Sequence, residues 1–403
     1  MIDRSSSAET APLALQILEL SLEVDVSRRL ADLRDWTETW QMEDLRLRQQ
    51  VESLNPNRRA DVLLGSQISS LRRQLTLRIT RQPIYLDPEA VRQAGFANLR
   101  HHLSVQYAQM SPTDRLLWLN NLYFLLTPTL RSLIEKLDSI RRYRSMGQQR
   151  CFLVGGVSGA GKSSLLNWYA VNYLPTVQAR RNRVPVIKID APVSNRSTKP
   201  LFHRMLLACG AATLRGDEEH YLQLLELYFQ QCGVELLVID EVEHITQPGL
   251  RRRLLELTNL TGVPIVCASC YPIGWAAGDA EIQGRWNDYF ELTQFTGPRL
   301  DAFLTMLDLL LPFEQDGYLG LREVLDEQTK KTAAGPAHYI EQWTDGILRE
   351  MIVLIMDACF KAITSGQSRL TLDILNQAWK DIKRAKVVNF LDHLRAQNGS
   401  AHV

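Results

Sequence analysis

The residues most suited to chemistry in this sequence form a glycine-rich segment, VGGVSGAGKSS, at positions 154–164. Within it, Gly156, Gly161, Lys162 and Ser163 satisfy the pattern G-x-x-x-x-G-K-[ST]. Glycines let a loop wrap its backbone N–H groups around a phosphate, the lysine can reach the β- and γ-phosphate oxygens, and the serine hydroxyl can ligate Mg²⁺. The segment therefore predicts a site for a nucleoside triphosphate and Mg²⁺.

Two adjacent carboxylates support this prediction. In the segment GVELLVIDEVEHI, an apolar run ends in Asp240 and Glu241. A carboxylate at the tip of a buried strand can hold the water shell of Mg²⁺, and the next one can polarise the attacking water. The expected nucleotide-binding residues are Gly156, Val157, Ser158, Gly159, Ala160, Gly161, Lys162, Ser163, Ser164 and Asp240, with Ser163 and Asp240 at the metal and Lys162 and Glu241 catalytic.

Three further residues are weaker candidates. The apolar run 263–268 is followed by Ser269 and Cys270, and either could contact the γ-phosphate or the water. An uninvolved strand end explains the pair about as well. Arg285, in the segment EIQGRWNDYF, is a third catalytic candidate, because a guanidinium could reach a neighbouring subunit's nucleotide and stabilise charge during phosphoryl transfer. The alternative is an ordinary surface arginine.

Short apolar runs alternate with helical patterns around these motifs. This alternation predicts an α/β fold with a parallel sheet and helices on both faces. Helices are predicted on either side, as an N-terminal helical region and a C-terminal helical lid. No strand is expected after Gly297. The expected strands are Cys151–Val154, Val184–Ile189, Leu236–Ile239, Val263–Ala268 and Tyr289–Phe295, and the expected C-terminal helices are Arg299–Leu311, Leu319–Lys331, Ala337–Ile363 and Leu370–Arg384.

We expect three domains, at residues 1–110, 111–296 and 297–403. Helical periodicity runs from about Leu13 to Leu77 and again from Leu116 to Arg144, where Thr127-Pro128 could kink the helix. Eight arginines between Arg46 and Arg81 face only two acids. They could form a face that binds DNA or a partner. Alternatively, they could form a solvated helix face that pairs with the acidic stretch before them, and we slightly favour this second interpretation.

The motifs, taken in order, resemble an AAA+ ATPase, and more narrowly the TnsC/TniB-type ATPases that regulate DNA transposition. The segments that carry the resemblance are FLVGGVSGAGKSSLL, VPVIKIDAPVSNRSTKPLFHRML, GVELLVIDEVEHI, TGVPIVCAS and EIQGRW. The resemblance implies a transposon-encoded regulator, with a CRISPR-associated transposon left open as its source. It also implies ATP and Mg²⁺ as cofactors, rings or filaments around double-stranded DNA, and transposase and target-selector proteins as partners.

The same resemblance implies DNA contacts in the loop after the second strand. Lys199 matches the basic position of that loop, Arg196 lies near it, and Arg215 belongs to the next inward-facing loop. Long cationic side chains suit phosphate tracking without sequence readout. One departure concerns the lid helix, where many AAA+ proteins have an arginine and this sequence has His338 and Tyr339.

Composition limits the alternatives. The chain has 46 Lys and Arg against 45 Asp and Glu, so a net charge of +1 excludes a protein coated in basic charge, but not a local basic track. No apolar run suits a membrane span and no signal peptide is visible, which predicts a cytoplasmic protein without a membrane partner.

A signalling or defence NTPase that recruits a protein effector remains the main alternative. A protein-remodelling ATPase is less favoured, because the loop after the second strand is polar and basic.

Overall fold

The structure is a computed structural model, and no helix in the part that it describes is long and apolar enough to cross a membrane. The described residues are 95–121, 125–143, 151–173, 182–193, 197–211, 215–277, 279–325 and 332–384, with the pairs 84–85 and 176–177 and scattered residues from 18 to 53. Six of the arginines between Arg46 and Arg81 lie outside these ranges, as does Arg196.

The chain divides into two compact units. The first contains the described residues from Leu126 to Thr293 and some from the segment Asp35–Gln82. The second combines those from Gln294 onwards with Pro83–Leu125 and part of Leu18–Arg34. The sequence-based division placed these last two segments mainly in an N-terminal domain, whereas in the structure they share a unit with the C-terminal helices.

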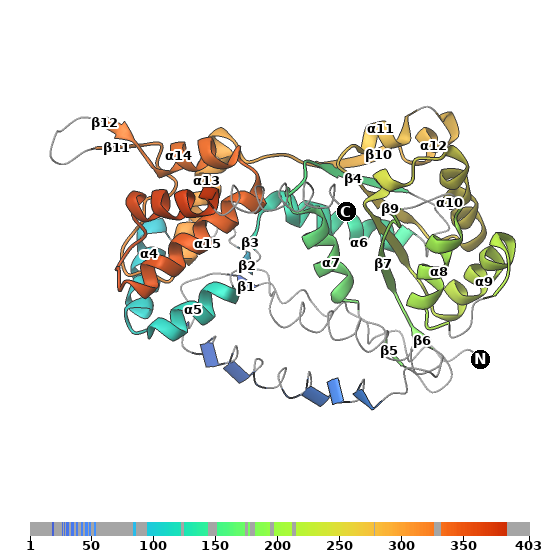
Figure 1. Cartoon of the computed structure of the whole chain (residues 1–403), viewed down its shortest axis with the longest axis horizontal. Coiled ribbons are helices and arrows are strands. Elements are labelled where there is room, and N and C mark those ends of the chain that lie inside the picture. The colour runs from blue at the N-terminus through green and yellow to red at the C-terminus, as the bar shows by residue number, and fades with distance from the viewer. Residues whose placement is uncertain are drawn as a thin grey trace, which may run out of the picture. The chain divides into compact units, whose positions relative to one another are not determined.

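A five-stranded parallel sheet forms the centre of the first unit (Figure 1). The strand order is β10-β4-β9-β8-β7, so β9 lies between the strand before the glycine-rich loop and the strand that ends in Asp240. All five predicted strands are present, with bounds that differ by up to three residues. They are β4 (Phe152–Gly156), β7 (Val186–Asp190), β8 (Leu236–Asp240), β9 (Ile265–Ala268) and β10 (Asp288–Leu292).

Helices cover both faces of this sheet, as predicted. Leu153, Ile187 and Leu237 join one hydrophobic cluster with buried residues of α8 (Lys199–Ala208), α9 (Glu218–Gln231) and α10 (Pro248–Thr261). Helix α7 (Lys162–Val171) packs against β4 and β7, on the other side of the sheet in Figure 1. Because side chains alternate along a strand, even-numbered residues of β7 and β8 point away from the α8–α10 cluster.

The remaining elements of the first unit are short, apart from one helix. Helix α6 (Pro128–Tyr143) begins at Pro128, so the chain starts a new helix where the sequence predicts only a kink. Two small strands pair antiparallel, and short helices connect β8 to β10. These elements are β5 (Thr176–Val177), β6 (Asn182–Arg183), η2 (Val242–His244), α11 (Pro272–Ala276) and α12 (Ala280–Arg285).

The second unit is mainly helical and has its own apolar core. Residues of all its main helices contribute, among them Leu103, Leu304 and Leu354. Buried polar side chains also bond to backbone carbonyls there: Trp118 Nε1 donates to Leu310 O at 2.8 Å. The labelled helices are α4 (Phe96–Ala108), α5 (Pro112–Asn121), α13 (Gly297–Leu310), α14 (Pro336–Thr344) and α15 (Leu348–Thr364), and residues 372–384 form a further helix.

Two predictions for the C-terminal part are wrong. The expected absence of strands fails, because β11 (Glu323–Leu325) lies inside the expected helix Leu319–Lys331 and pairs antiparallel with β12 (Thr332–Ala334), which begins directly after it. Gly320 approaches α13 so closely that a Cβ would lie 1.9 Å from Thr305 Oγ1, which fixes this segment by tertiary contact. The expected helix Ala337–Ile363 is broken at Asp345 and Gly346, since both have positive φ.

Three two-residue strands were also missed: β1 (Leu18–Glu19), β2 (Ile84–Tyr85) and β3 (Leu125–Leu126). They form a small sheet in the order β1-β2-β3, so Leu18 lies in a strand where helical periodicity predicts a helix. Runs of two residues carry no readable period. Helix α14 holds His338 and Tyr339, whose ring centroids are 5.5 Å apart.

A buried carboxylate in α13 gives a first prediction. Asp308 accepts hydrogen bonds from Gly317 N at 3.3 Å and Leu319 N at 3.5 Å, and it is only 6% exposed. Burial raises the pKa of Asp308 from 3.8 to about 6, although the Arg100 guanidinium acts in the opposite direction and Asp316 adds to the rise. Folding therefore favours the protonated carboxyl.

Asp308→Asn should stabilise the protein at neutral pH. A folded-state pKa above the unfolded value means that stability falls as pH rises from about 4 to 6, and that the loss persists above pH 6. The shift corresponds to an upper limit of about 3 kcal/mol, since one unit is worth about 1.4 kcal/mol. Thermal unfolding at pH 4 and 7.5 should show a melting temperature that rises in the variant relative to the wild type as the pH increases. An equal difference at both pH values would contradict this prediction.

Candidate functional site

The glycine-rich loop joins β4 to α7 with backbone conformations that few other residues adopt. Gly156, Gly159 and Gly161 have φ values of 140°, 85° and 100°. A Cβ on Gly156 would lie 2.4 Å from Leu292 O, so this position requires glycine for space as well as for conformation. The loop thus presents backbone at the amino end of α7, the arrangement that suits an anion.

Lys162 is the first residue of α7 and folds back over this loop. Its side chain is buried, with Nζ donating to Gly156 O at 2.5 Å and to Val157 O at 3.1 Å. These carbonyls fix the ammonium inside the curve of the loop. A phosphate held by the loop would therefore meet a cation that is already positioned. Ser163 follows on the first turn of α7 and is exposed.

Asp240 ends β8 and is almost completely buried, with 2% of the residue exposed. Its Oδ1 accepts from Glu241 N at 2.9 Å, and its Oδ2 lies 3.6 Å from Lys188 Nζ. Strands β8 and β4 are parallel and have only β9 between them. Asp240 and the glycine-rich loop therefore lie at the same edge of the sheet, the one formed by the carboxyl ends of the strands. Like Lys188, Asp240 is even-numbered and points to the face that α7 covers.

The described residues could fit Mg²⁺ only together with a phosphate. Among them, no group of three or more His, Cys, Asp or Glu side chains gathers as a metal site. Mg²⁺ prefers one or two protein ligands supplemented by water and phosphate oxygens. The hydroxyl of Ser163 and the carboxylate of Asp240 match that requirement in type.

Glu241 has a left-handed backbone conformation, with φ 57° and ψ 39°. Such a conformation is uncommon for a residue other than glycine and is found at functional sites more than elsewhere. The turn directs the carboxylate into solvent, where 54% of the side chain is exposed, and Oε2 lies 3.9 Å from His244 Nε2. A carboxylate placed beyond the strand tip can reach a water molecule outside the sheet.

The structure treats Ser269 and Cys270 differently. Ser269 is 1% exposed, and its Oγ accepts from Tyr271 N at 2.9 Å within the turn after β9. Cys270 Sγ accepts from Lys162 Nζ at 3.5 Å. The thiol therefore contacts the loop lysine, while the hydroxyl shapes the turn, and the sensing role of either residue stays a prediction.

Comparison with known proteins agrees with this site. The family model described as "Bacterial TniB protein" matches residues 115–288, which include the loop, both strand tips and Arg285. This segment is therefore similar to a TniB-type AAA+ ATPase domain, and we refer to it below as the TniB-type domain. No curated protein sequence matches the chain.

Three solved structures show low similarity to the chain. The RuvB Holliday junction branch migration motor of Thermotoga maritima is 16% identical, with a TM-score of 0.38 over 62% of this chain and 68% of that one. The ORC2 protein of Aeropyrum pernix in its ADP form is 16% identical, with a TM-score of 0.42 over 63% and 69%. Drosophila ORC bound to DNA is 14% identical, with a TM-score of 0.41 over 67% and 66%.

Arg285 lies at the edge of the TniB-type domain opposite its own glycine-rich loop. It ends α12, three residues before β10, and Asp288 at the start of β10 pairs in register with Phe152 at the start of β4. The loop follows the other end of β4, roughly 16 Å further along for a five-residue strand. Arg285 Nη2 donates to Asn259 Oδ1 at 3.2 Å. Arg285 therefore lies away from the loop of its own domain, and its catalytic role stays a prediction.

The start of α8, which holds Lys199, and the segment of Arg215 come together at the start of α9. Thr198 N donates to Glu218 Oε1 at 3.1 Å, which joins the segment before α8 to the first turn of α9. Lys199 is exposed, and its Nζ lies 5.4 Å from the centre of the Tyr221 ring. Arg215 is also exposed. The two described candidates for DNA contact thus lie on neighbouring segments of the TniB-type domain, with Lys199 at the first position of α8 instead of in the expected loop and Arg215 before α9.

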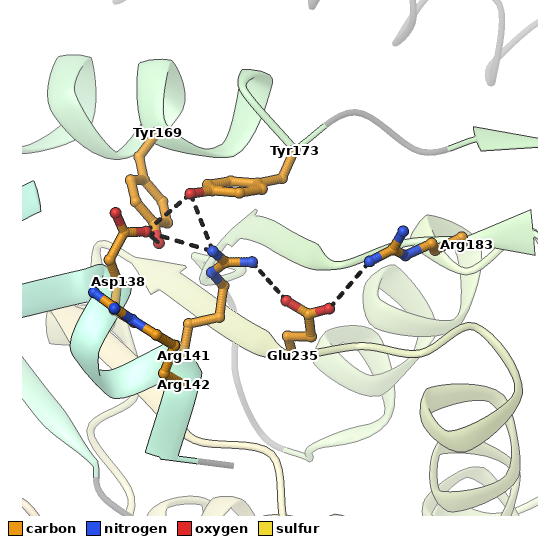
Figure 2. A network of polar contacts seen from close by, with 7 residues as sticks. All are labelled: Asp138, Arg141, Arg142, Tyr169, Tyr173, Arg183 and Glu235. Carbon is orange, nitrogen blue, oxygen red and sulfur yellow. Dashed lines mark hydrogen bonds and ion pairs between the residues drawn. The ribbon is translucent and has the colours of Figure 1, made fainter. Parts of the chain in front are cut away.

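A polar network that the sequence analysis missed lies at the far ends of α7 and β8. Figure 2 shows Arg141 of α6 between Tyr173, which follows α7, and Glu235, which precedes β8. Arg141 Nη1 pairs with Glu235 Oε2 at 2.6 Å, and its guanidinium lies 4.2 Å from the centre of the Tyr173 ring. Arg183 pairs with the other oxygen of Glu235 at 3.5 Å.

Asp138 connects the same network to α7 (Figure 2). Its Oδ1 accepts from Tyr169 Oη at 2.7 Å and from Tyr173 Oη at 2.8 Å. Burial raises the pKa of Tyr173 to about 12, so its hydroxyl stays a donor at neutral pH. Because α7 carries Lys162 and β8 carries Asp240 at their other ends, the network anchors both elements that form the candidate site.

Proposed function

We propose that this chain is an ATP-dependent, DNA-binding regulator of transposition that assembles on double-stranded DNA and links a target selector to a transposase. The match of residues 115–288 to the TniB family carries the proposal. The glycine-rich loop beside a buried strand-tip carboxylate supports ATP binding. The position of Arg285 away from its own loop supports self-association into a ring or filament.

Each site residue then has one task in the hydrolysis of ATP to ADP and phosphate. Backbone N–H groups from Gly156 to Ser164 bind the phosphates, and Lys162 neutralises the β- and γ-oxygens. Ser163 and Asp240 would hold Mg²⁺, which would supply positive charge for the leaving ADP. Glu241 accepts a proton from the attacking water, and Arg285 of a neighbouring subunit stabilises the transferring phosphoryl group.

Double-stranded DNA is the partner that the neighbouring segments of Lys199 and Arg215 suit. Two exposed cations on adjacent segments give each subunit a small number of phosphate contacts, and a ring or filament multiplies that number. Contacts of this kind hold any sequence equally well. Sequence choice would therefore come from the separate target selector.

Electron microscopy with an ATP analogue and duplex DNA tests the proposal. We expect rings or filaments that require both. Lys199→Ala combined with Arg196→Ala should weaken DNA binding for all sequences and lower the salt slope by about two, while ATP binding is unchanged. The matched control is Lys380→Ala with Arg384→Ala, which removes two exposed cations of the second unit.

Monomers under every nucleotide and DNA condition would contradict the proposal. Assembly that depends on nucleotide but ignores DNA and salt would instead support a signalling or defence NTPase that recruits a protein effector.

A further inference from the structure

A lysine lies beside the strand-tip carboxylate that the proposed mechanism assigns to Mg²⁺. Lys188 belongs to β7, the strand next to β8, and its side chain is only 12% exposed. Its Nζ lies 3.6 Å from Asp240 Oδ2 and also pairs with Asp190 Oδ1. Lys188 is not part of the sequence motifs that predict the nucleotide site.

The register of the two strands explains how one lysine reaches two carboxylates. Asp190 and Asp240 are paired at the ends of β7 and β8, and Lys188 precedes Asp190 by two residues, so all three side chains share one face of the sheet. Adjacent strands are about 4.8 Å apart, so the carboxylates are close neighbours. The flexible stem of the lysine lets its ammonium bridge them.

The two carboxylates differ in exposure, and this difference indicates which of them Lys188 can leave. The Asp240 side chain is 3% exposed, whereas that of Asp190 is 56% exposed. Arg204 Nη1 holds the backbone of Asp190 by donating to its carbonyl at 2.6 Å. Lys188 can therefore leave Asp240 and stay paired with Asp190, so its ammonium keeps a negatively charged partner.

We propose that Lys188 is an internal counter-ion that occupies the Asp190–Asp240 pair in the absence of nucleotide and keeps divalent cations away from it. The inference rests on the proposed function in placing Asp240 near Mg²⁺. A dication would face the repulsion of the ammonium until the phosphates of ATP supply enough negative charge to compensate. Cation binding at Asp240 thereby becomes dependent on nucleotide, and Lys188 acts as a positioning residue.

The test measures Mn²⁺ binding to the nucleotide-free full chain by electron paramagnetic resonance. Mn²⁺ takes the same oxygen ligands as Mg²⁺. Lys188→Met should bind Mn²⁺ at least about tenfold more tightly than the wild type, because two carboxylates then lack their cation. Lys188→Arg keeps the charge and should stay weak. Equal, weak binding by Lys188→Met and the wild type would overturn the inference.

Two controls localise the effect. Asp190→Asn added to Lys188→Met should remove the gain, because one carboxylate remains. Lys136→Met removes a lysine that pairs with Asp288 at 2.5 Å at the opposite edge of the sheet, and it should leave Mn²⁺ binding unchanged. A gain in Lys136→Met as large as that in Lys188→Met would overturn the inference.

Folding and nucleotide binding are measured separately. Where Lys188→Met does not fold, Lys188→Gln keeps a hydrogen-bond donor for Asp240 without the charge, and the same gain is expected. Binding of a fluorescent ATP analogue by the wild type tests the proposed function independently. A wild type that binds no ATP would contradict that function, whereas an unchanged Mn²⁺ affinity in both Lys188 variants would contradict the counter-ion alone.

Discussion

Lys162→Ala should abolish nucleotide binding, with a loss of affinity of at least about 100-fold. The ammonium is fixed by Gly156 O and Val157 O at the amino end of α7, where it can bond to phosphate without further ordering. Hydrogen bonds to charged groups contribute about 1.5–3 kcal/mol each, and 1.4 kcal/mol is tenfold in affinity. Titration with a fluorescent ATP analogue measures the loss.

Thermal unfolding without nucleotide separates this loss from misfolding. Alanine removes a lysine whose partners are loop carbonyls, and these can bond to water instead, so we expect a small change in the melting temperature. Lys136→Ala is the matched control in the same unit and should bind nucleotide normally. Normal nucleotide affinity in a folded Lys162→Ala protein would show that the loop is not the phosphate site.

The glycine-rich loop and the five strands were predictable because their signals are local. The loop needs glycine where φ is positive, and the sequence has glycine at positions 156, 159 and 161. Each strand is a short apolar run between helical patterns, and β8 ends at Asp240, where the apolar run ends. The strand order brings these motifs to one edge.

The errors came from tertiary contacts that no local pattern records. Strand β11, paired with β12, takes the place of part of an expected helix, and Gly335 before α14 leaves no room for a Cβ, which would lie 2.3 Å from Leu321 O. The break between α14 and α15 had a local signal, since Asp-Gly favours turns. That signal was outweighed by the helical periodicity on both sides.

Residues that position the site were missed for the same reason. Arg141 and Glu235 are 94 positions apart, and Lys188 reaches Asp240 from another strand. A partial signal existed. Tyr169 and Tyr173 are four residues apart at the end of the helical pattern that follows the glycine-rich loop, and residues at this spacing face the same side of a helix. Only the fold shows that Asp138 accepts from both.

Glu241→Gln should bind ATP with normal affinity and hydrolyse it about 100-fold more slowly. The side chain keeps its size and the left-handed turn stays intact, but the amide cannot accept a proton from water. Loss of a positioned general base typically costs 10²–10⁴-fold in rate. Release of phosphate in a single turnover measures the rate, and a fluorescent ATP analogue measures the affinity.

Glu243→Gln is the matched control, because this carboxylate lies in the same turn but two residues further from the strand tip. It should hydrolyse ATP at the normal rate. If hydrolysis permits disassembly, Glu241→Gln should also form assemblies on duplex DNA that outlast those of the wild type, since ATP remains bound. A normal rate in Glu241→Gln would show that another group activates the water. A slow rate with short-lived assemblies would separate hydrolysis from release of DNA.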